Sequence, residues 1–300
     1  MRFSVSSLLT LVAAATAVVA QPAKRGVPLN PPSSSLLEVK WAELPAAPIE
    51  ALTNAKRFAR GLPPLNPRKR TPNRGVHNGA LHARQATHVA SAPRAETSPV
   101  APTSTKCNIL VKNSATGQEL GFVSKEWNEF AEYGPLENTQ DNALEVSFSA
   151  SPDTPTHQID LLAVNGKSPA HPFMGAGVGF GSEDPTIGPG NPNFLFLLGV
   201  TQTPAGSTPS SEANNSFSQA TGADSPSESA IWSYDPITRA FTSQWVNPDG
   251  SSAKTNILWS NQDGRNDLFT MTGDADAFRA KYGVDAPEVN FTCVPRTVAV

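Results

Sequence analysis

Cysteine, histidine and aromatic residues are all scarce in this sequence of 300 residues, which has two cysteines, five histidines and 7% aromatic side chains. Two cysteines are too few for a zinc knuckle or for a small fold held together by several disulfides. Residues 107–300 contain only His157 and His171, which are poorly spaced for zinc and lie in predicted loops. We expect both histidines to be solvated rather than catalytic.

The motifs of several enzyme classes are also missing. No stretch fits the dinucleotide fingerprint G-x-G-x-x-G before a helix, no phosphate-binding loop carries its lysine, and no serine lies in a G-x-S-x-G elbow. A copper histidine brace needs histidine at the mature N-terminus, whereas the expected cleavage points leave Gln21 or Thr71 there. The sequence therefore predicts no metal, no cofactor and no assignable catalytic residue.

The apolar run at the N-terminus has the features of a secretory signal peptide. Residues 1–20 combine the positive charge of Arg2 with a short apolar core and with small residues up to Ala20, the expected cleavage position. No later stretch approaches the ~20 apolar residues of a spanning helix. We expect a secreted, extracellular protein without a membrane span, folded in an oxidising compartment.

Charge divides the remaining chain into two parts of opposite sign. Residues 21–106 hold 13 basic and four acidic residues, whereas residues 107–300 hold nine basic and 22 acidic residues. The net charges are +9 and −13. An acidic second part argues against nucleic acid as a partner, because phosphates would be repelled.

Residues 21–106 have the composition of a disordered, basic, propeptide-like leader. Proline, serine, alanine and arginine dominate, so the segment has little apolar surface to bury, although one short helix is predicted over residues 48–61. Dibasic pairs end at Arg25, Arg57 and Arg70. They predict cutting by a kexin-type processing protease, whose acidic pocket would pair with both cations.

Residues 107–295 predict an all-β domain. About ten short segments alternate apolar and polar residues and are separated by Gly, Pro, Asn and Asp turns, which is typical of an antiparallel β-sandwich or distorted barrel. One short helix is expected over residues 274–283, with Asp274 as its N-cap and Gly283 as its stop. Residues 204–229 form a Ser/Thr/Pro-rich loop between two of the strands.

Covalent modifications can be predicted at four positions of this domain. Cys107 and Cys293 lie in the first and last predicted strands, on the buried parity of each, and we expect them to form a disulfide. Asn214 and Asn290 begin N-x-S/T sequons, so both are candidate glycosylation sites.

A glycine at every second position marks residues 175–181, where Gly175, Gly177, Gly179 and Gly181 form one bare face of a predicted strand. Such a face lets another surface approach the backbone closely. Aromatic side chains could fill the space, supplied by the tryptophans of the domain: Trp232, Trp245 and Trp259. Alternatively, the glycines form a ligand groove in which a sugar ring stacks on a tryptophan such as Trp245.

Glu126, Glu129 and Glu132 recur at a spacing of three, which would place them on one face of a helix, although Gly134 and Pro135 would end it. Two facing carboxylates are what a glycosidase needs. With 22 acidic residues in this part of the chain, no pair can be chosen, and a solvated acidic face is the simpler interpretation.

Four stretches resemble a group of uncharacterised secreted proteins of mushroom-forming (basidiomycete) fungi: LTNAKRFARGLPPLNPRKRTP, SAIWSYDPITRAFTSQWVNPDGS, MTGDADAFRAKYG and VNFTCVP. The resemblance implies secretion and supplies no catalytic residues. Two hypotheses remain. The first is a non-catalytic extracellular domain with cell-wall glycan as its partner, and the second is a polysaccharide-directed hydrolase that uses two carboxylates.

Overall fold

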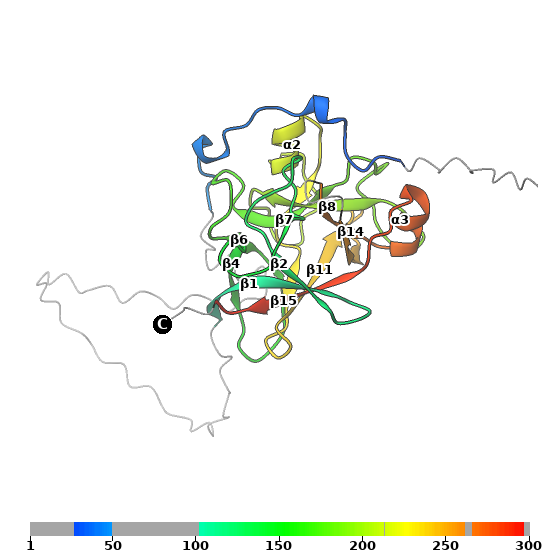
Figure 1. The fold of residues 1–300 in the computed structure, drawn as a ribbon. Coiled ribbons are helices and arrows are strands. Elements are labelled where there is room, and N and C mark those ends of the chain that lie inside the picture. Colours follow the sequence, from blue (N-terminus) through cyan, green and yellow to red (C-terminus); the bar gives the residue numbers. More distant parts are fainter. Residues whose placement is uncertain (1–26, 50–101, 213, 262–265, 297–300) are drawn as a thin grey trace, which may run out of the picture.

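The computed structural model describes residues 27–49, 102–212, 214–261 and 266–296. These residues form a nearly all-β fold, a single antiparallel sheet that curls into a half-barrel, with two α-helices (Figure 1). The predicted fold class is therefore confirmed. The predicted signal peptide, the dibasic pairs and most of the predicted helix at 48–61 lie outside the described residues.

Fifteen strands make up the sheet of the described residues. In chain order they are β1 Thr103–Asn113, β2 Glu119–Val123, β3 Leu136–Glu137, β4 Glu145–Ala150, β5 Thr156–Ile159, β6 Leu161–Ala163, β7 Phe173–Val178, β8 Phe194–Val200, β9 Ser227–Glu228, β10 Trp232–Tyr234, β11 Ala240–Val246, β12 Ser252–Lys254, β13 Asn256–Ser260, β14 Leu268–Thr272 and β15 Val289–Val294. Two of these strands have two residues and three have three residues, which is why a sequence pattern suggests fewer strands.

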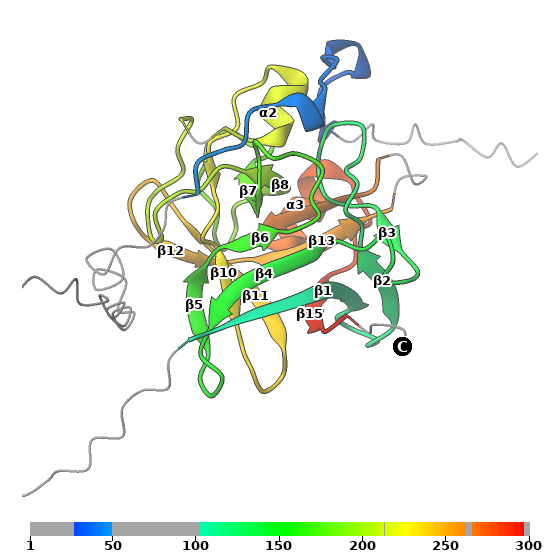
Figure 2. The ribbon, with the colours of Figure 1, turned by 90° about the vertical axis from the view of Figure 1, so that its left-hand side faces the viewer.

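The main path of the sheet runs β13-β14-β8-β7-β6-β4-β1-β15-β11-β10-β5, with β2, β3, β9 and β12 attached beside it. The path bends back on itself rather than extending flat (Figure 2). Leu258 of β13 forms a bridge to Glu288, the residue before β15, although six strands lie between β13 and β15 in the path. This contact draws one end of the sheet over its middle and encloses a core.

Two apolar clusters fill the described part of the fold. The large cluster holds side chains from β1, β4, β11 and β15 together with Met174 and Ala176 of β7. The helix-side cluster lies where the helices pack and includes Phe196 and Leu198 of β8. Strands β7 and β8 are buried along their whole length because the two clusters cover their opposite faces.

Cys107 and Cys293 form the predicted disulfide, with their Cα atoms 5.5 Å apart. Strands β1 and β15 are antiparallel neighbours in the sheet, and Ile109 is paired with Cys293 across them. The alternation expected for β15 is also present, since Phe291 and Cys293 are buried while Asn290 is exposed. The disulfide therefore joins two strands that the sheet already places side by side.

The helix α3 (Ala275–Tyr282) confirms the prediction made from its caps. The Asp274 side chain accepts a hydrogen bond from the Ala277 backbone at 2.9 Å, and Gly283 ends the helix with a left-handed φ of 67°. The helix α2 (Ser216–Thr221) was not predicted and lies inside the expected 204–229 loop, with Asn215 as its N-cap. Six residues are too few for apolar periodicity to be recognised.

Residues 27–49 do not stand apart from the domain. They contain two 3-10 turns, η1 (Ser33–Ser35) and η2 (Trp41–Glu43), and run across α2 and the neighbouring loops (Figures 1 and 2). This part of the expected leader is thus packed on the β domain. Among the described residues, no helix has the length and apolarity needed to cross a membrane.

Candidate functional site

The glycine face is closed, which contradicts its interpretation as a ligand groove. A Cβ atom added to Gly175 would overlap the backbone carbonyl of Glu228 in β9, and one added to Gly179 would overlap the ring of Phe194. At Gly177 it would lie 2.5 Å from the Ser225 hydroxyl. A Cβ atom added to Gly181 would lie 3.0 Å from the Tyr282 ring. The glycines make room for β9 and for two aromatic rings, so no sugar can lie on them.

The tryptophans expected to fill that space lie elsewhere. The Trp232 and Trp245 side chains are fully buried in the large cluster, on the opposite face of β7 from the glycines. Trp232 donates from Nε1 to the Met174 carbonyl at 2.6 Å, and Trp245 donates to the Pro185 carbonyl at 2.8 Å. Trp259 packs against the same cluster. Trp245 has no free face on which a sugar could stack, because its ring is 0% exposed.

The three glutamates spaced by three residues do not share a face. Residues 124–135 form an irregular loop, in which Ala131 has a φ of 60°. Glu126 and Glu129 are exposed, whereas Glu132 is completely buried and bridges to Leu198 of β8. The prediction that these glutamates form a solvated acidic face is therefore wrong for Glu132.

Glu132 is held by two asparagine side chains. Its Oε2 atom accepts hydrogen bonds from Asn128 Nδ2 at 2.6 Å and from Asn30 Nδ2 at 3.1 Å. Its Oε1 atom is buried and has no hydrogen-bond partner among the described residues. Burial raises the pKa of this carboxyl to about 7, because the charged form loses its hydration, and the two asparagine hydrogen bonds offset only part of that effect.

Beside Asn30 lies a hollow of about 330 Å³. Its walls come from four distant parts of the chain, namely residues 27–33, 129–130, 266–268 and 282–284. The residues that line it are Val27, Pro28, Leu29, Asn30, Pro31, Ser33, Glu129, Phe130, Asn266, Leu268, Tyr282, Gly283 and Val284. Because the first wall belongs to the N-terminal segment, the β domain alone does not form this hollow.

Two residues that line the hollow carry an amide oxygen without a hydrogen-bond partner among the described residues. They are the Oδ1 atoms of Asn30 and Asn266, and both are buried. An amide oxygen only accepts, so a ligand that reached either atom would have to donate a hydrogen bond, as a hydroxyl group does. Glu129 is the one charged side chain in the lining, and the surface of the hollow is shared evenly between polar and apolar atoms. The site therefore favours a neutral ligand with hydroxyl groups and apolar C–H surface.

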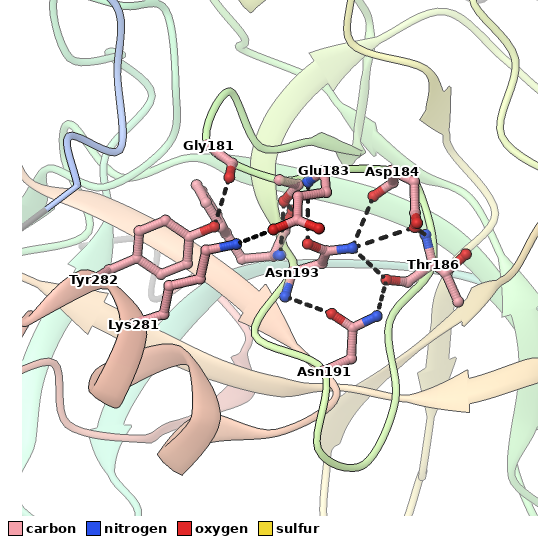
Figure 3. A network of polar contacts seen from close by, with 10 residues as sticks. Gly181, Glu183, Asp184, Thr186, Asn191, Asn193, Lys281 and Tyr282 are labelled. Atoms are coloured by element: carbon pink, nitrogen blue, oxygen red, sulfur yellow. Dashed lines mark hydrogen bonds and ion pairs between the residues drawn. The ribbon is translucent and has the colours of Figure 1, made fainter.

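A polar network fixes the Tyr282 wall of the hollow (Figure 3). The Tyr282 hydroxyl donates to the Gly181 carbonyl at 2.7 Å, and Lys281 pairs with Glu183 at 2.9 Å. The loop that carries Gly181 and Glu183 is tied back by Asn193, whose amide donates to the Thr186 carbonyl at 3.0 Å. The end of α3 is thus held to the loop after β7 by side chains, and the hollow has a preformed wall.

Glu228 is a second buried acid with a raised pKa, about 8, because its burial outweighs the hydrogen bond that it accepts from the Val246 backbone. It cannot act together with Glu132. The strand register pairs Glu228 with Ala176, which belongs to the large cluster, whereas Glu132 is paired with Leu198 of the helix-side cluster. Their side chains therefore leave opposite faces of the sheet.

The two histidines differ in their surroundings. His157 is exposed, as expected, and contacts the Ser233 hydroxyl at 3.0 Å. His171 is only 1% exposed, which corrects the expectation that it would be solvated. Burial lowers its pKa to about 4, so the ring is neutral at physiological pH. The residues next to His171 in the sequence do not indicate that it is buried. Trp41 and Trp127, which cover this part of the domain, are far away in the chain.

The predicted glycosylation sites Asn214 and Asn290 are both exposed, at the start of α2 and on β15. In the part of the chain that the structure describes, no group of three or more His, Cys, Asp or Glu side chains could hold a metal ion.

Comparison with known proteins gives no assignment for this site. No protein-family profile, no curated protein and no solved structure matches the chain. The function must therefore be argued from the geometry. Neither the hollow nor Glu132 as a buried acid could have been found from a motif, because Asn30 lies 102 residues from the carboxyl to which it donates.

Proposed function

We propose that this protein is a secreted, non-catalytic glycan-binding protein, and that the hollow bounded by Asn30, Asn266 and Tyr282 is its ligand site. The observation that carries the proposal is that two residues of this half-apolar hollow, Asn30 and Asn266, each have an amide oxygen without a hydrogen-bond partner among the described residues. A sugar offers hydroxyl donors for such oxygens and apolar C–H faces for the remaining wall. The volume is at the small end of the range for ligand pockets, which suits one unit at a chain end.

The competing hypothesis, a hydrolase with two carboxylates, has less support. A buried glutamic acid with a raised pKa is what a general acid requires, and Glu132 has that property. Its only equally perturbed counterpart among the described acids, Glu228, lies on the other face of the sheet and cannot reach the same bond. A facing pair of carboxylates is required for either stereochemical course of glycoside hydrolysis.

Pull-down on insoluble chitin, β-glucan and cellulose, paired with a reducing-sugar assay on the same samples, tests both hypotheses. We expect retention on at least one polymer without sugar release. Asn266→Ala should reduce retention at least tenfold, because it removes a side chain that lines the hollow and carries an unpartnered acceptor, whereas the exposed Asn138→Ala should not. Sugar release that is lost in Glu132→Gln would overturn the non-catalytic assignment, and equal retention of both asparagine variants would overturn the site.

A further inference from the structure

The N-terminal segment 27–49 contacts the β domain along its whole length. Near its start, Leu29 is buried in the helix-side cluster and the Asn30 amide donates to Glu132 at 3.1 Å. In the middle, the Leu37 backbone N–H donates to the Ala220 carbonyl at the end of α2 at 2.7 Å. Near its end, the Ala47 backbone N–H donates to the Pro169 carbonyl at 3.0 Å.

Trp41 is the main side-chain anchor of the second half of this segment. Its ring packs edge-on against Trp127, with centroids 5.0 Å apart, and against His171, with centroids 5.9 Å apart. Trp127 and His171 are themselves buried, with 6% and 1% of their surface exposed. A tryptophan ring that packs on buried aromatic side chains is the kind of contact that dominates peptide and protein interfaces.

The hydrogen bonds and ring contacts join residues 27–49 to residues 127–220, and Leu29 adds packing in the helix-side cluster, so none of them depends on the chain that connects the two parts. We propose that segment 27–49 is a peptide ligand of its own β domain and stays bound as a separate chain after the connection is cut. The surface that receives it consists of Glu132, Trp127, His171 and the carbonyls of Pro169 and Ala220. A leader that is discarded after cutting has no need of such contacts. Segment 27–49, in contrast, has buried apolar or hydrogen-bonding groups at both of its ends.

The predicted cuts after Arg57 and Arg70 fall between the two parts, although both lie outside the described residues. Each cut is hydrolysis of one peptide bond by a dibasic-specific protease, which consumes one water and leaves a carboxylate and an amine. The product would be a two-chain protein. The same cuts would leave the hollow intact, because its first wall, residues 27–33, belongs to the retained peptide.

The test uses the secreted full-length chain treated with a kexin-type protease. Denaturing electrophoresis and N-terminal sequencing establish which bonds are cut, and size-exclusion chromatography under native conditions followed by mass spectrometry shows whether the peptide that contains residues 27–49 remains. We expect it to co-elute with the β domain and to separate only in denaturant. A β-domain peak that lacks the peptide overturns the proposal.

Two matched variants assign the binding to the contacts described. Trp41→Ala should release most of the peptide from the cut protein while circular dichroism shows a folded β domain, whereas Ile49→Ala should retain it, because Ile49 is 54% exposed. Equal retention in both variants would contradict the role of Trp41. A variant in which residues 66–70 are replaced by the site of another specific protease applies the same test if the dibasic pairs resist cutting. The readout is the mass of the peptide, so it is independent of glycan binding.

Discussion

Replacing Gly177 by alanine should destabilise the β domain, because the added methyl group has no space. It would lie 2.5 Å from Ser225 Oγ, 2.7 Å from Leu198 Cδ1 and 2.9 Å from Ser227 Oγ. Both hydroxyls are committed, since Ser225 donates to the Val178 carbonyl at 2.9 Å and Ser227 donates to the Ser225 carbonyl at 2.7 Å. The methyl group can be admitted only if these side chains shift, and all three are buried and have little room to do so.

Two effects of opposite sign decide the size of the change. A glycine-to-alanine substitution restricts the unfolded chain, which stabilises a protein by about 0.4–1 kcal/mol where the native site accepts the methyl group. Overpacking of a buried site costs about 1–3 kcal/mol. Three contacts below 3 Å make overpacking the larger effect at Gly177. For a domain of this size, each kcal/mol lowers the melting temperature by about 2–4 °C.

Gly188→Ala is the matched control, because a Cβ atom there would have no neighbour within 4 Å. Thermal unfolding followed by circular dichroism compares the two variants with the native protein. We expect Gly177→Ala to melt several degrees lower and Gly188→Ala to melt at the native temperature or slightly above. Equal melting temperatures for the two variants would contradict the interpretation that the glycine face is closely packed.

Three further predictions concern covalent bonds and pH. Cys293→Ala should lower the free energy of unfolding by up to about 5 kcal/mol, because the bridge closes a loop of 186 residues, and two free thiols in the unreduced native protein would contradict the pairing. In protein secreted by a eukaryotic host, mass spectrometry before and after endoglycosidase should find a glycan on Asn214, which is exposed, and an unmodified Asn214 would refute this. The raised pKa of Glu132 means that the folded state holds its proton more tightly than the unfolded state. Its contribution to stability is therefore full below about pH 4.5 and is lost as the pH rises through about 7, and urea titrations should show a smaller loss between pH 5 and pH 8 in Glu132→Gln than in the native protein.

The sequence by itself determined the features that depend on neighbours in the chain. Alternation with a period of two indicated strands such as β4 and β11, and the caps Asp274 and Gly283 bounded α3, because each of these signals is local. The pairing of Cys107 with Cys293 could also be predicted, since a chain with two cysteines offers one intramolecular choice.

Only the tertiary structure decided which distant groups meet. The burial of Glu132, the hollow beside Asn30 and the packing of Trp41 on Trp127 all depend on a segment that, by composition alone, has too little apolar surface to fold. That estimate does not include the apolar surface that the β domain supplies to the segment. The glycine face shows the same limit, because a bare strand face is equally compatible with a groove and with close packing until the strand register brings β9 and Phe194 onto it. Local pattern fixes which face of an element is apolar, whereas the partner of that face is set by contacts between residues far apart in the chain.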